Sequence, residues 1–195
     1  MLDSGGSNTT AAATLARFRS TVTLKGNRAA VIGVRPVGLR TAELLRRERA
    51  EVTVLTFPPD AIEGGYRRAS GIPVAQEAGF KVVEPRSSDQ LDAALAGHVA
   101  MFPAGPAGVQ VLRRSWARVE GVRVVVDYSA AEPVGVEGVD RTDDMAGRDG
   151  VLKLGALAVG GPKVKLQRRC LQRMFETKGT VLDLDGVYDV ALEVL

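Results

Sequence analysis

Residues 28–56 read RAAVIGVRPVGLRTAELLRRERAEVTVLT, which predicts a strand, a glycine-containing turn, an amphipathic helix and a second strand. The apolar run at 28–34 is typical of a strand buried on both faces. Pro36 suits the first position of a helix, and 51–56 gives the second strand. Two strands joined by a helix in this way form a βαβ unit, which requires a parallel sheet.

Strands and helices alternate beyond this unit. Apolar segments predict further strands at 81–84, 98–102 and 122–127. Helix-compatible segments at 89–95 and 108–118 separate them. The alternation predicts an α/β fold with a doubly wound, mainly parallel sheet and helices on both faces.

The first helix and one long loop stand out by composition. Ser7, Thr9 and Thr10 precede an alanine-rich stretch, so hydroxyl capping predicts a helix over about 8–20. Residues 129–150 are rich in glycine, proline and aspartate and show no periodicity. They predict a long functional loop.

The C-terminal part is expected to end in helices. The sequence GALAVGG at 155–161 reads as a strand, and a basic amphipathic helix is expected over about 162–178. Asp183 or Asp185 is expected to cap a last short helix.

Composition excludes several classes of protein. At 195 residues and 45% apolar residues, the chain fits one domain, or one domain with a small appendage. No apolar run is long enough for a membrane span, and the polar N-terminus does not resemble a signal peptide. With Cys170 the only cysteine and His98 the only histidine, we expect no disulfide, no metal site and a cytoplasmic location. The net charge is +3, but arginines are scattered among acids, so no nucleic-acid partner is expected.

The turn after the first strand predicts a dinucleotide site. Gly33 and Gly38 occupy the first and third glycine positions of a G-x-G-x-x-G fingerprint, where they serve the tight turn and the packing of the helix. Arg35 replaces the middle glycine, and Pro36 and Val37 begin the helix whose N–H groups would bind phosphate. Arg35 either obstructs the phosphates or binds them as a bidentate partner. A turn whose glycines serve only packing is the alternative.

Two other strand ends bear on the cofactor. Thr56 and Phe57 end the second strand, where an acid or an arginine normally distinguishes NAD from NADP, so that choice stays open. Phe57 packs against adenine or closes the strand end. Ala104 and Gly105 follow the fourth strand at its carboxyl end and would leave room for the nicotinamide ribose.

Further segments form a pattern together with this turn: GSNTTAAA at 6–13, PVGLRTA at 36–42, FPAGPAG at 102–108, DYSAAEPVGVEGVD at 127–140 and GALAVGGPKVKLQRRC at 155–170. The pattern resembles bacterial NAD(P)-dependent methylene-tetrahydromethanopterin dehydrogenases. Those enzymes oxidise a pterin-bound methylene group to methenyl by hydride transfer, and some accept methylene-tetrahydrofolate. The resemblance implies a Rossmann-type cofactor domain beside a pterin-facing domain.

Some features depart from the family pattern. The family has GTGPVG where this chain has GVRPVG, a basic residue at the position of Phe57 and an asparagine at the position of Gly5. Family members also carry about a hundred more residues before the first block, which form most of the pterin-side domain. We therefore expect a remnant helix of that domain at 1–20, a dinucleotide-binding domain at 21–160 and C-terminal helices at 161–195 that pack on the remnant helix. A homo-oligomer or a partner chain is expected to supply the rest.

The resemblance also implies a catalytic residue. Hydride transfer from a methylene group needs proximity and orientation rather than a general base. Lys163 matches a family lysine at the pterin cleft, where its cation would orient acidic or carbonyl parts of the substrate. Its expected place in the first turn of a helix is unfavourable for a cation, which supports a functional role over a solvated lysine.

Candidate substrate-binding residues lie at two places. By the resemblance, Asn8, Thr9 and Thr10 line the cleft opposite the nicotinamide, although helix capping also explains the threonines. Asp127 and Ser129 follow the fifth strand and would meet substrate. A buried aspartate bonded to loop amides is the alternative for Asp127.

Two other functions compete with this one. A non-catalytic relative would keep the dinucleotide fold and bind a nucleotide or a protein partner. A shikimate dehydrogenase-like enzyme would share the two-domain plan, but the lysine–aspartate pair expected of it has no evident counterpart here.

Overall fold

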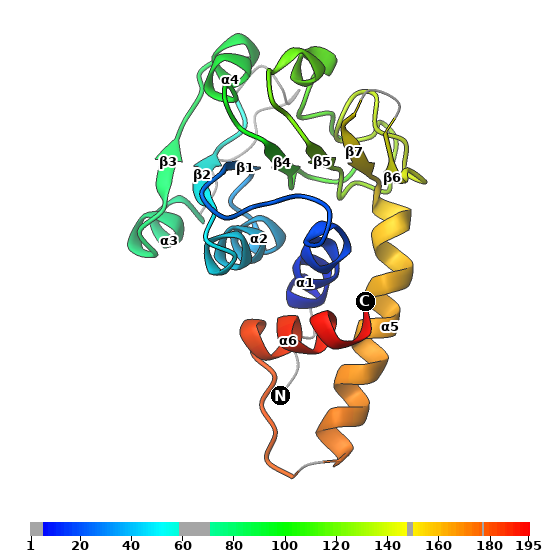
Figure 1. Ribbon diagram of the computed structural model, residues 1–195. Helices are drawn as coiled ribbons and strands as arrows, with labels where there is room; N and C mark the ends of the chain where they lie inside the picture. Colours follow the sequence, from blue (N-terminus) through cyan, green and yellow to red (C-terminus); the bar gives the residue numbers. More distant parts are fainter. Residues whose placement is uncertain (1–5, 59–70, 148–149, 177) are drawn as a thin grey trace.

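The computed structural model describes residues 6–58, 71–147, 150–176 and 178–195. Its centre is a seven-stranded sheet in the order β3-β2-β1-β4-β5-β7-β6 (Figure 1). The strands are β1 (Arg28–Ile32), β2 (Glu51–Leu55), β3 (Lys81–Val83), β4 (Ala100–Pro103), β5 (Val124–Val126), β6 (Asp144–Ala146) and β7 (Leu152–Leu154). Only the β6–β7 pair is antiparallel among these neighbours. The predicted fold class is thus confirmed.

Helices cover both faces of the sheet. They are α1 (Ser7–Phe18), α2 (Pro36–Arg47), α3 (Gly71–Glu77), α4 (Ser88–Ala94), the 3-10 helix η2 (Arg114–Arg118), α5 (Ala156–Glu176) and α6 (Leu184–Val194). Helices α4 and η2 lie on one side of the sheet, and α1 and α2 lie on the other (Figure 1).

Strand β1 shows why both faces need cover. Ala29 and Val31 belong to the core cluster shared with α1 and α2, whereas Ala30 and Ile32 belong to the cluster under α4 and η2. Successive side chains of a strand point to opposite faces, so a continuous apolar run fills both cores.

Helix α1 joins the sheet to the C-terminal helices. It packs against α2, α5 and α6, and three successive alanines, Ala11 to Ala13, are fully buried. The ring of Phe18 lies 5.6 Å from the ring of Phe102 in β4, measured between centroids. Small residues allow close helix packing, and the aromatic pair fixes α1 to the sheet.

Helix α6 is fixed to α2 by polar contacts as well. Arg47 of α2 pairs with Asp185 and Asp189, and the Tyr188 hydroxyl donates a hydrogen bond to Glu48 at 2.9 Å. Asp183 caps α6 by accepting a hydrogen bond from the Gly186 amide, so of the two predicted caps it is the one used.

The start of α5 corrects the sequence prediction. Residues 155–161 are not a strand, because the strand is β7 and α5 begins at Ala156. A Cβ on Gly155 would lie 2.1 Å from the Asp140 carbonyl oxygen, so this glycine makes the strand-to-helix turn. Pro162 lies inside the helix rather than at its start. Burial of Val159 and Leu166 on one face continues the helix across the proline.

Two further predictions differ from the structure. Only Arg114–Arg118 of the helix expected at 108–118 is helical, as a 3-10 helix, because Leu112 forms a bridge with Val136 instead. The long loop at 129–150 contains β6. The division into segments 1–20, 21–160 and 161–195 stays a prediction, and its second boundary falls inside α5.

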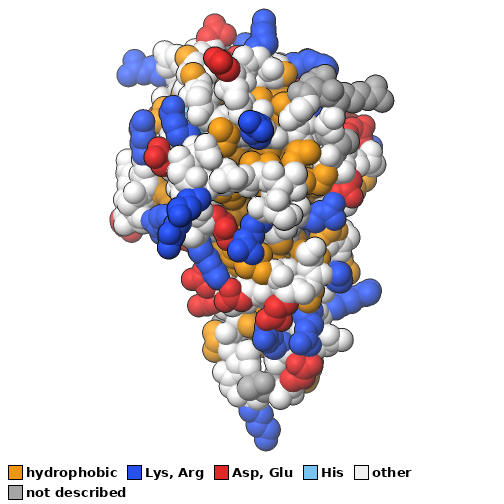
Figure 2. All heavy atoms as spheres, in the orientation of Figure 1, with side chains coloured by type: hydrophobic (Ala, Val, Ile, Leu, Met, Phe, Trp, Pro, Cys, Tyr) orange, Lys and Arg blue, Asp and Glu red, His pale blue; other side chains and the backbone are white. Residues whose placement is uncertain are grey.

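Charged side chains of both signs lie among one another on the surface. Figure 2 shows Lys and Arg side chains interspersed with Asp and Glu on the face drawn. Among the described helices, none is both long and apolar enough to cross a membrane.

Candidate functional site

The turn after β1 depends on a glycine at its first position. Gly33 has a φ of 121°, a region that side chains other than glycine rarely adopt. A Cβ there would also lie 2.6 Å from the Ala104 carbonyl oxygen and 2.7 Å from Cζ of Phe57. The turn therefore brings the ends of β1, β2 and β4 together.

Helix α2 begins against this turn. A Cβ on Gly38 would lie 2.2 Å from the Gly33 carbonyl oxygen, so only glycine permits the observed contact. At the start of α2, the Leu39 amide donates a hydrogen bond to the Arg35 carbonyl, which is the first bond of the helix. Amides in the first turn of a helix have no acceptor within it. Those of Val37 and Gly38 are therefore the donors that α2 offers to an anion.

Arg35 occupies the middle glycine position without backbone strain. Its φ of −84° and ψ of 169° are extended values that any residue adopts. Its side chain is exposed. The replacement of glycine is therefore compatible with the turn itself, and its effect on a phosphate depends on the guanidinium alone.

A pocket of about 300 Å³ lies beside this turn. Its lining comes from the first turns of α1 and α2 and from the loops after β4 and β5: Ser7, Arg35, Pro36, Val37, Ala104, Gly105, Ala107, Tyr128 and Ser129. Arg35 is the one charged side chain in this lining. A small pocket with neutral walls, hydroxyl groups and a single cation at a helix start is suited to an anionic ligand.

The structure thus brings together six predicted site residues: Arg35, Pro36, Val37, Ala104, Gly105 and Ser129. The pocket lies at the carboxyl ends of parallel strands, where open α/β sheets bind ligands. Its donors and its glycine turn fit the pyrophosphate part of a dinucleotide.

The end of β2 is closed by Phe57. Its ring lies against Gly33 and packs on the core cluster that contains Ile32 and Leu55. Thr56 donates its backbone amide to the Val83 carbonyl at 3.0 Å. Neither residue lines the 300 Å³ pocket, so the ring acts as a plug at the strand end, and the predicted contacts of both residues with a cofactor stay predictions.

Asp127 organises the loop after β5. Its carboxylate accepts hydrogen bonds from the amides of Ser129 at 2.8 Å and Val136 at 3.0 Å, and the side chain is 2% exposed. Burial raises the pKa of Asp127, although these amide bonds oppose the shift. This is the structural role considered for Asp127, and its predicted substrate contact stays a prediction.

Tyr128 was missed in the sequence. Its hydroxyl lies 3.0 Å from Oγ1 of Thr41 in α2. Burial raises the pKa of Tyr128 to about 12, so the phenol stays protonated at neutral pH. No local pattern indicates this role, because the partner Thr41 is distant along the chain.

The predicted substrate-binding residues of α1 lie outside the 300 Å³ pocket. Thr9 and Thr10 donate their hydroxyls to the Gly6 carbonyl at 3.1 and 2.8 Å, and neither lines the 300 Å³ pocket. Asn8 lines a second, more open pocket of about 840 Å³ between α2 and α6. Their substrate contacts stay predictions.

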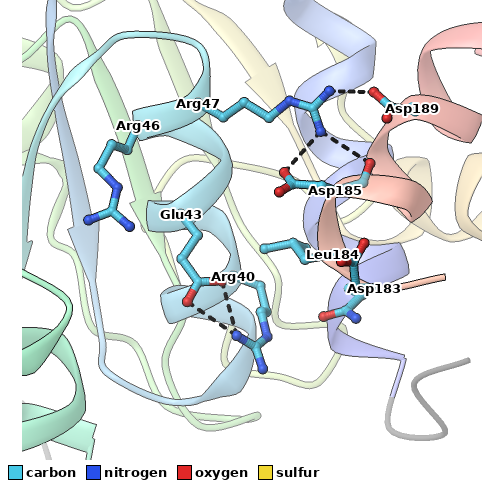
Figure 3. Close-up of a pocket in the computed structure, with 9 residues that line it drawn as sticks. Arg40, Glu43, Arg46, Arg47, Asp183, Leu184, Asp185 and Asp189 are labelled. Carbon is cyan, nitrogen blue, oxygen red and sulfur yellow. Dashed lines mark hydrogen bonds and ion pairs between the residues drawn. The ribbon is translucent and has the colours of Figure 1, made fainter. Parts of the chain in front are cut away.

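That second pocket is lined by charges that are largely paired with one another (Figure 3). Arg47 reaches Asp185 and Asp189, and Arg40 contacts Glu43 at 3.0 Å. The pairs of Arg47 join the two helices, the Arg40–Glu43 pair lies within α2, and together they leave little charge to attract a ligand.

Lys163 lies beside the start of α1. A Cβ built on Gly6 would be 3.0 Å from its Nζ, and the neighbouring Gln167 amide contacts the Thr9 hydroxyl at 3.4 Å. Because α5 begins at Ala156, Lys163 is not in the first turn, so the helix-dipole argument for its function is wrong. Its proximity to α1 remains as support.

Two proteins of known name are similar to this chain in sequence. No protein-family model matches it. It is 34% identical over 198 residues to "Bifunctional protein MdtA" of Methylorubrum extorquens, covering 100% of this chain and 68% of the relative. It is 28% identical over 206 residues to "NAD(P)-dependent methylenetetrahydromethanopterin dehydrogenase" of the same organism, covering 98% of this chain and 68% of the relative.

A solved structure supports the fold alone. Transhydrogenase from Sinorhizobium meliloti matches with a TM-score of 0.60 and 15% identity, over 95% of this chain and 53% of that chain. This chain therefore spans about half the length of that solved protein.

The raised pKa of Asp127 makes the free energy of unfolding depend on pH. The folded state raises its pKa above the ordinary value of 3.8, so the folded protein keeps a proton that the unfolded chain has already released. The stability contributed by protonated Asp127 is full below the ordinary pKa and falls as pH rises towards the folded pKa. Relative to Asp127→Asn, which does not titrate, the wild-type free energy of unfolding should fall as pH rises from below 3.8 through the higher pH at which folded Asp127 releases its proton. Urea unfolding across this range measures the difference, and a relative gain for the wild type would contradict the prediction.

Proposed function

Since the chain belongs to the family of MdtA and the NAD(P)-dependent methylenetetrahydromethanopterin dehydrogenases, we propose that it binds a nicotinamide dinucleotide and serves in hydride transfer. The single observation that carries the proposal is the pocket at the carboxyl edge of the sheet. Arg35 and the first turn of α2 form one wall of it, and Ala104 and Gly105 form another. The resemblance found in the sequence is confirmed by these relatives.

The residues of this chain would hold the cofactor in parts. The amides of Val37 and Gly38 and the guanidinium of Arg35 would bind the pyrophosphate. The small residues Ala104 and Gly105 would leave space for the nicotinamide ribose. A bound nicotinamide supplies the acceptor for a hydride. The preference for NAD or NADP stays open.

The proposed substrate is a pterin-bound one-carbon unit, methylene-tetrahydromethanopterin or methylene-tetrahydrofolate. Its methylene carbon would lose a hydride and become a methenyl cation, which is delocalised over the adjoining nitrogen atoms. No proton has to be removed, so orientation suffices. Lys163, together with Asn8, Thr9 and Thr10 of α1, would orient the pterin, and Asp127 would hold the loop that carries Ser129.

Location and assembly are part of the proposal. A single cysteine fits the reducing cytoplasm.

The predicted homo-oligomer or partner chain is supported by apolar side chains that α5 exposes at seven-residue spacing: Leu157, Val164 and Leu171, followed by Phe175, which is 88% exposed. Sedimentation equilibrium tests assembly, and a strictly monomeric chain would contradict a homo-oligomer.

Dinucleotide binding is the first test. Calorimetric titration with NAD, NADP and their reduced forms should give micromolar affinity for at least one. Arg35→Ala should weaken that affinity about tenfold through loss of a charge-assisted contact. Arg40→Ala removes an arginine of α2 that is paired with Glu43 outside this pocket, and it should change affinity less than about twofold.

Two outcomes would contradict this account. Tighter binding by Arg35→Ala would mean that the guanidinium obstructs the phosphates. Absence of binding at millimolar concentration would overturn the dehydrogenase function and favour the non-catalytic relative that binds a protein partner.

The substrate proposal is tested through Lys163. With either methylene pterin as substrate, Lys163→Met should lower kcat/KM by about tenfold or more, because the pterin loses an orienting cation. Cofactor affinity should not change. Lys165→Met is the matched control, because this lysine of the same helix donates to the Val194 carbonyl instead. Equal losses in both variants would contradict a substrate role, and absence of nicotinamide reduction by the wild type would overturn the pterin proposal.

A further inference from the structure

Two polar side chains of α5 converge on the start of α1. Lys163 and Gln167 are four residues apart, so they lie one turn apart on the same side of the helix. A Cβ built on Gly6 would lie 3.0 Å from Nζ of Lys163 and 3.7 Å from Nε2 of Gln167. Gly6 directly precedes Ser7, which lines the 300 Å³ pocket. The two side chains therefore meet beside the wall of that pocket.

Thr9 fixes the orientation of the Gln167 carboxamide. The Thr9 hydroxyl donates its single proton to the Gly6 carbonyl at 3.1 Å, so its oxygen accepts the 3.4 Å hydrogen bond from Nε2 of Gln167. Turning the carboxamide over would place Oε1 of Gln167 against the Thr9 oxygen with no proton between them. The nitrogen of the carboxamide is therefore held on the side of Thr9.

The remaining polar groups of this pair are available to a ligand. Within the part of the chain that the structure describes, Lys163 has no hydrogen bond or ion pair, and Gln167 has only its contact with Thr9. This leaves the second N–H and Oε1 of Gln167 and the ammonium of Lys163. Both side chains are half-buried, so a ligand can reach them. Together they offer several N–H donors, one carbonyl acceptor and one positive charge.

A pterin ring offers the complementary set of groups. One edge of the ring carries an N3–H donor beside a 4-oxo acceptor. A carboxamide pairs with such an edge through two hydrogen bonds, because Oε1 accepts from N3–H while Nε2 donates to the 4-oxo oxygen. A lysine cation beside that oxygen adds a charge-assisted contact. A phosphate or carboxylate group would offer acceptors alone and would leave Oε1 of Gln167 without a donor.

We propose that Gln167 is a specificity-determining residue, which recognises the N3–H and 4-oxo edge of the pterin beside Lys163. The inference rests on the proposed function, because the pterin substrate is part of that proposal. It deepens the function by naming the part of the substrate that is recognised and the side chain that recognises it. Both proposed substrates carry this edge.

The test changes one partner on each side of the contact. Gln167→Met keeps the approximate size of the side chain and removes its donor and acceptor. The ligands are 6-methyltetrahydropterin, whose ring both proposed substrates share, and its 4-amino analogue, in which an amino donor replaces the 4-oxo acceptor. Gln172→Met is the matched control, because it makes the same change at an exposed position of the same helix. Calorimetric titration gives the affinity of each protein for each ligand.

The expected result is a change of preference. The wild type should bind 6-methyltetrahydropterin about tenfold more tightly than the analogue, because Thr9 prevents the carboxamide from turning over to suit the amino group. Gln167→Met should bind 6-methyltetrahydropterin about tenfold more weakly than the wild type, and the analogue no more weakly. Gln172→Met should change neither affinity, and the affinity for the dinucleotide should stay the same in both variants.

The outcomes separate the inference from the proposed function. Equal weakening of both ligands in Gln167→Met would indicate a structural contact with Thr9 and would overturn the inference. A wild type without preference between the two ligands would overturn it without need of a variant. If the wild type bound a dinucleotide but neither ligand, the pterin substrate and the inference would fail together. If it reduced nicotinamide with a methylene pterin while Gln167→Met kept the wild-type preference, the inference alone would fail.

Discussion

The contact between Gly38 and the Gly33 carbonyl determines most of the site. No side chain fits between α2 and the end of β1, because a Cβ on Gly38 would lie 2.2 Å from that oxygen. The helix therefore begins directly at the carboxyl edge of the sheet, with its free amides directed to one place. Ala104, whose carbonyl approaches Gly33, brings the end of β4 to the same point. A pocket forms there because three backbone segments meet without side chains between them.

Helix α1 gives this pocket its second wall. It is fixed to the sheet by Phe18 and packs against α2, and its start at Ser7 lines the same pocket as the start of α2. Lys163 reaches the same helix start from α5. The proposed cofactor wall and the proposed substrate wall are therefore held by one set of packed helices, so a change in their spacing should affect both ligands.

The sequence predicts the site correctly where structure is determined locally. The strand, turn and helix around Gly33 follow from an apolar run, a proline at a helix start and two glycines with separate packing roles. It failed where distant contacts decide. Pro162 predicts the start of a helix, whereas α5 begins six residues earlier, at Ala156, and buries Val159 and Leu166 on either side of the proline. The place of Tyr128 in the pocket wall does not follow from local pattern, because its hydroxyl partner Thr41 lies far from it in the chain.

The central claim is that a dinucleotide binds at the carboxyl edge of the sheet. An amide chemical-shift titration of the ¹⁵N-labelled chain with its preferred dinucleotide tests the location directly. The account predicts that the largest changes occur at Val37, Gly38 and Gly105. Changes confined to the opposite edge of the sheet, around Arg28 and Arg123, or no changes at saturating concentration, would contradict it.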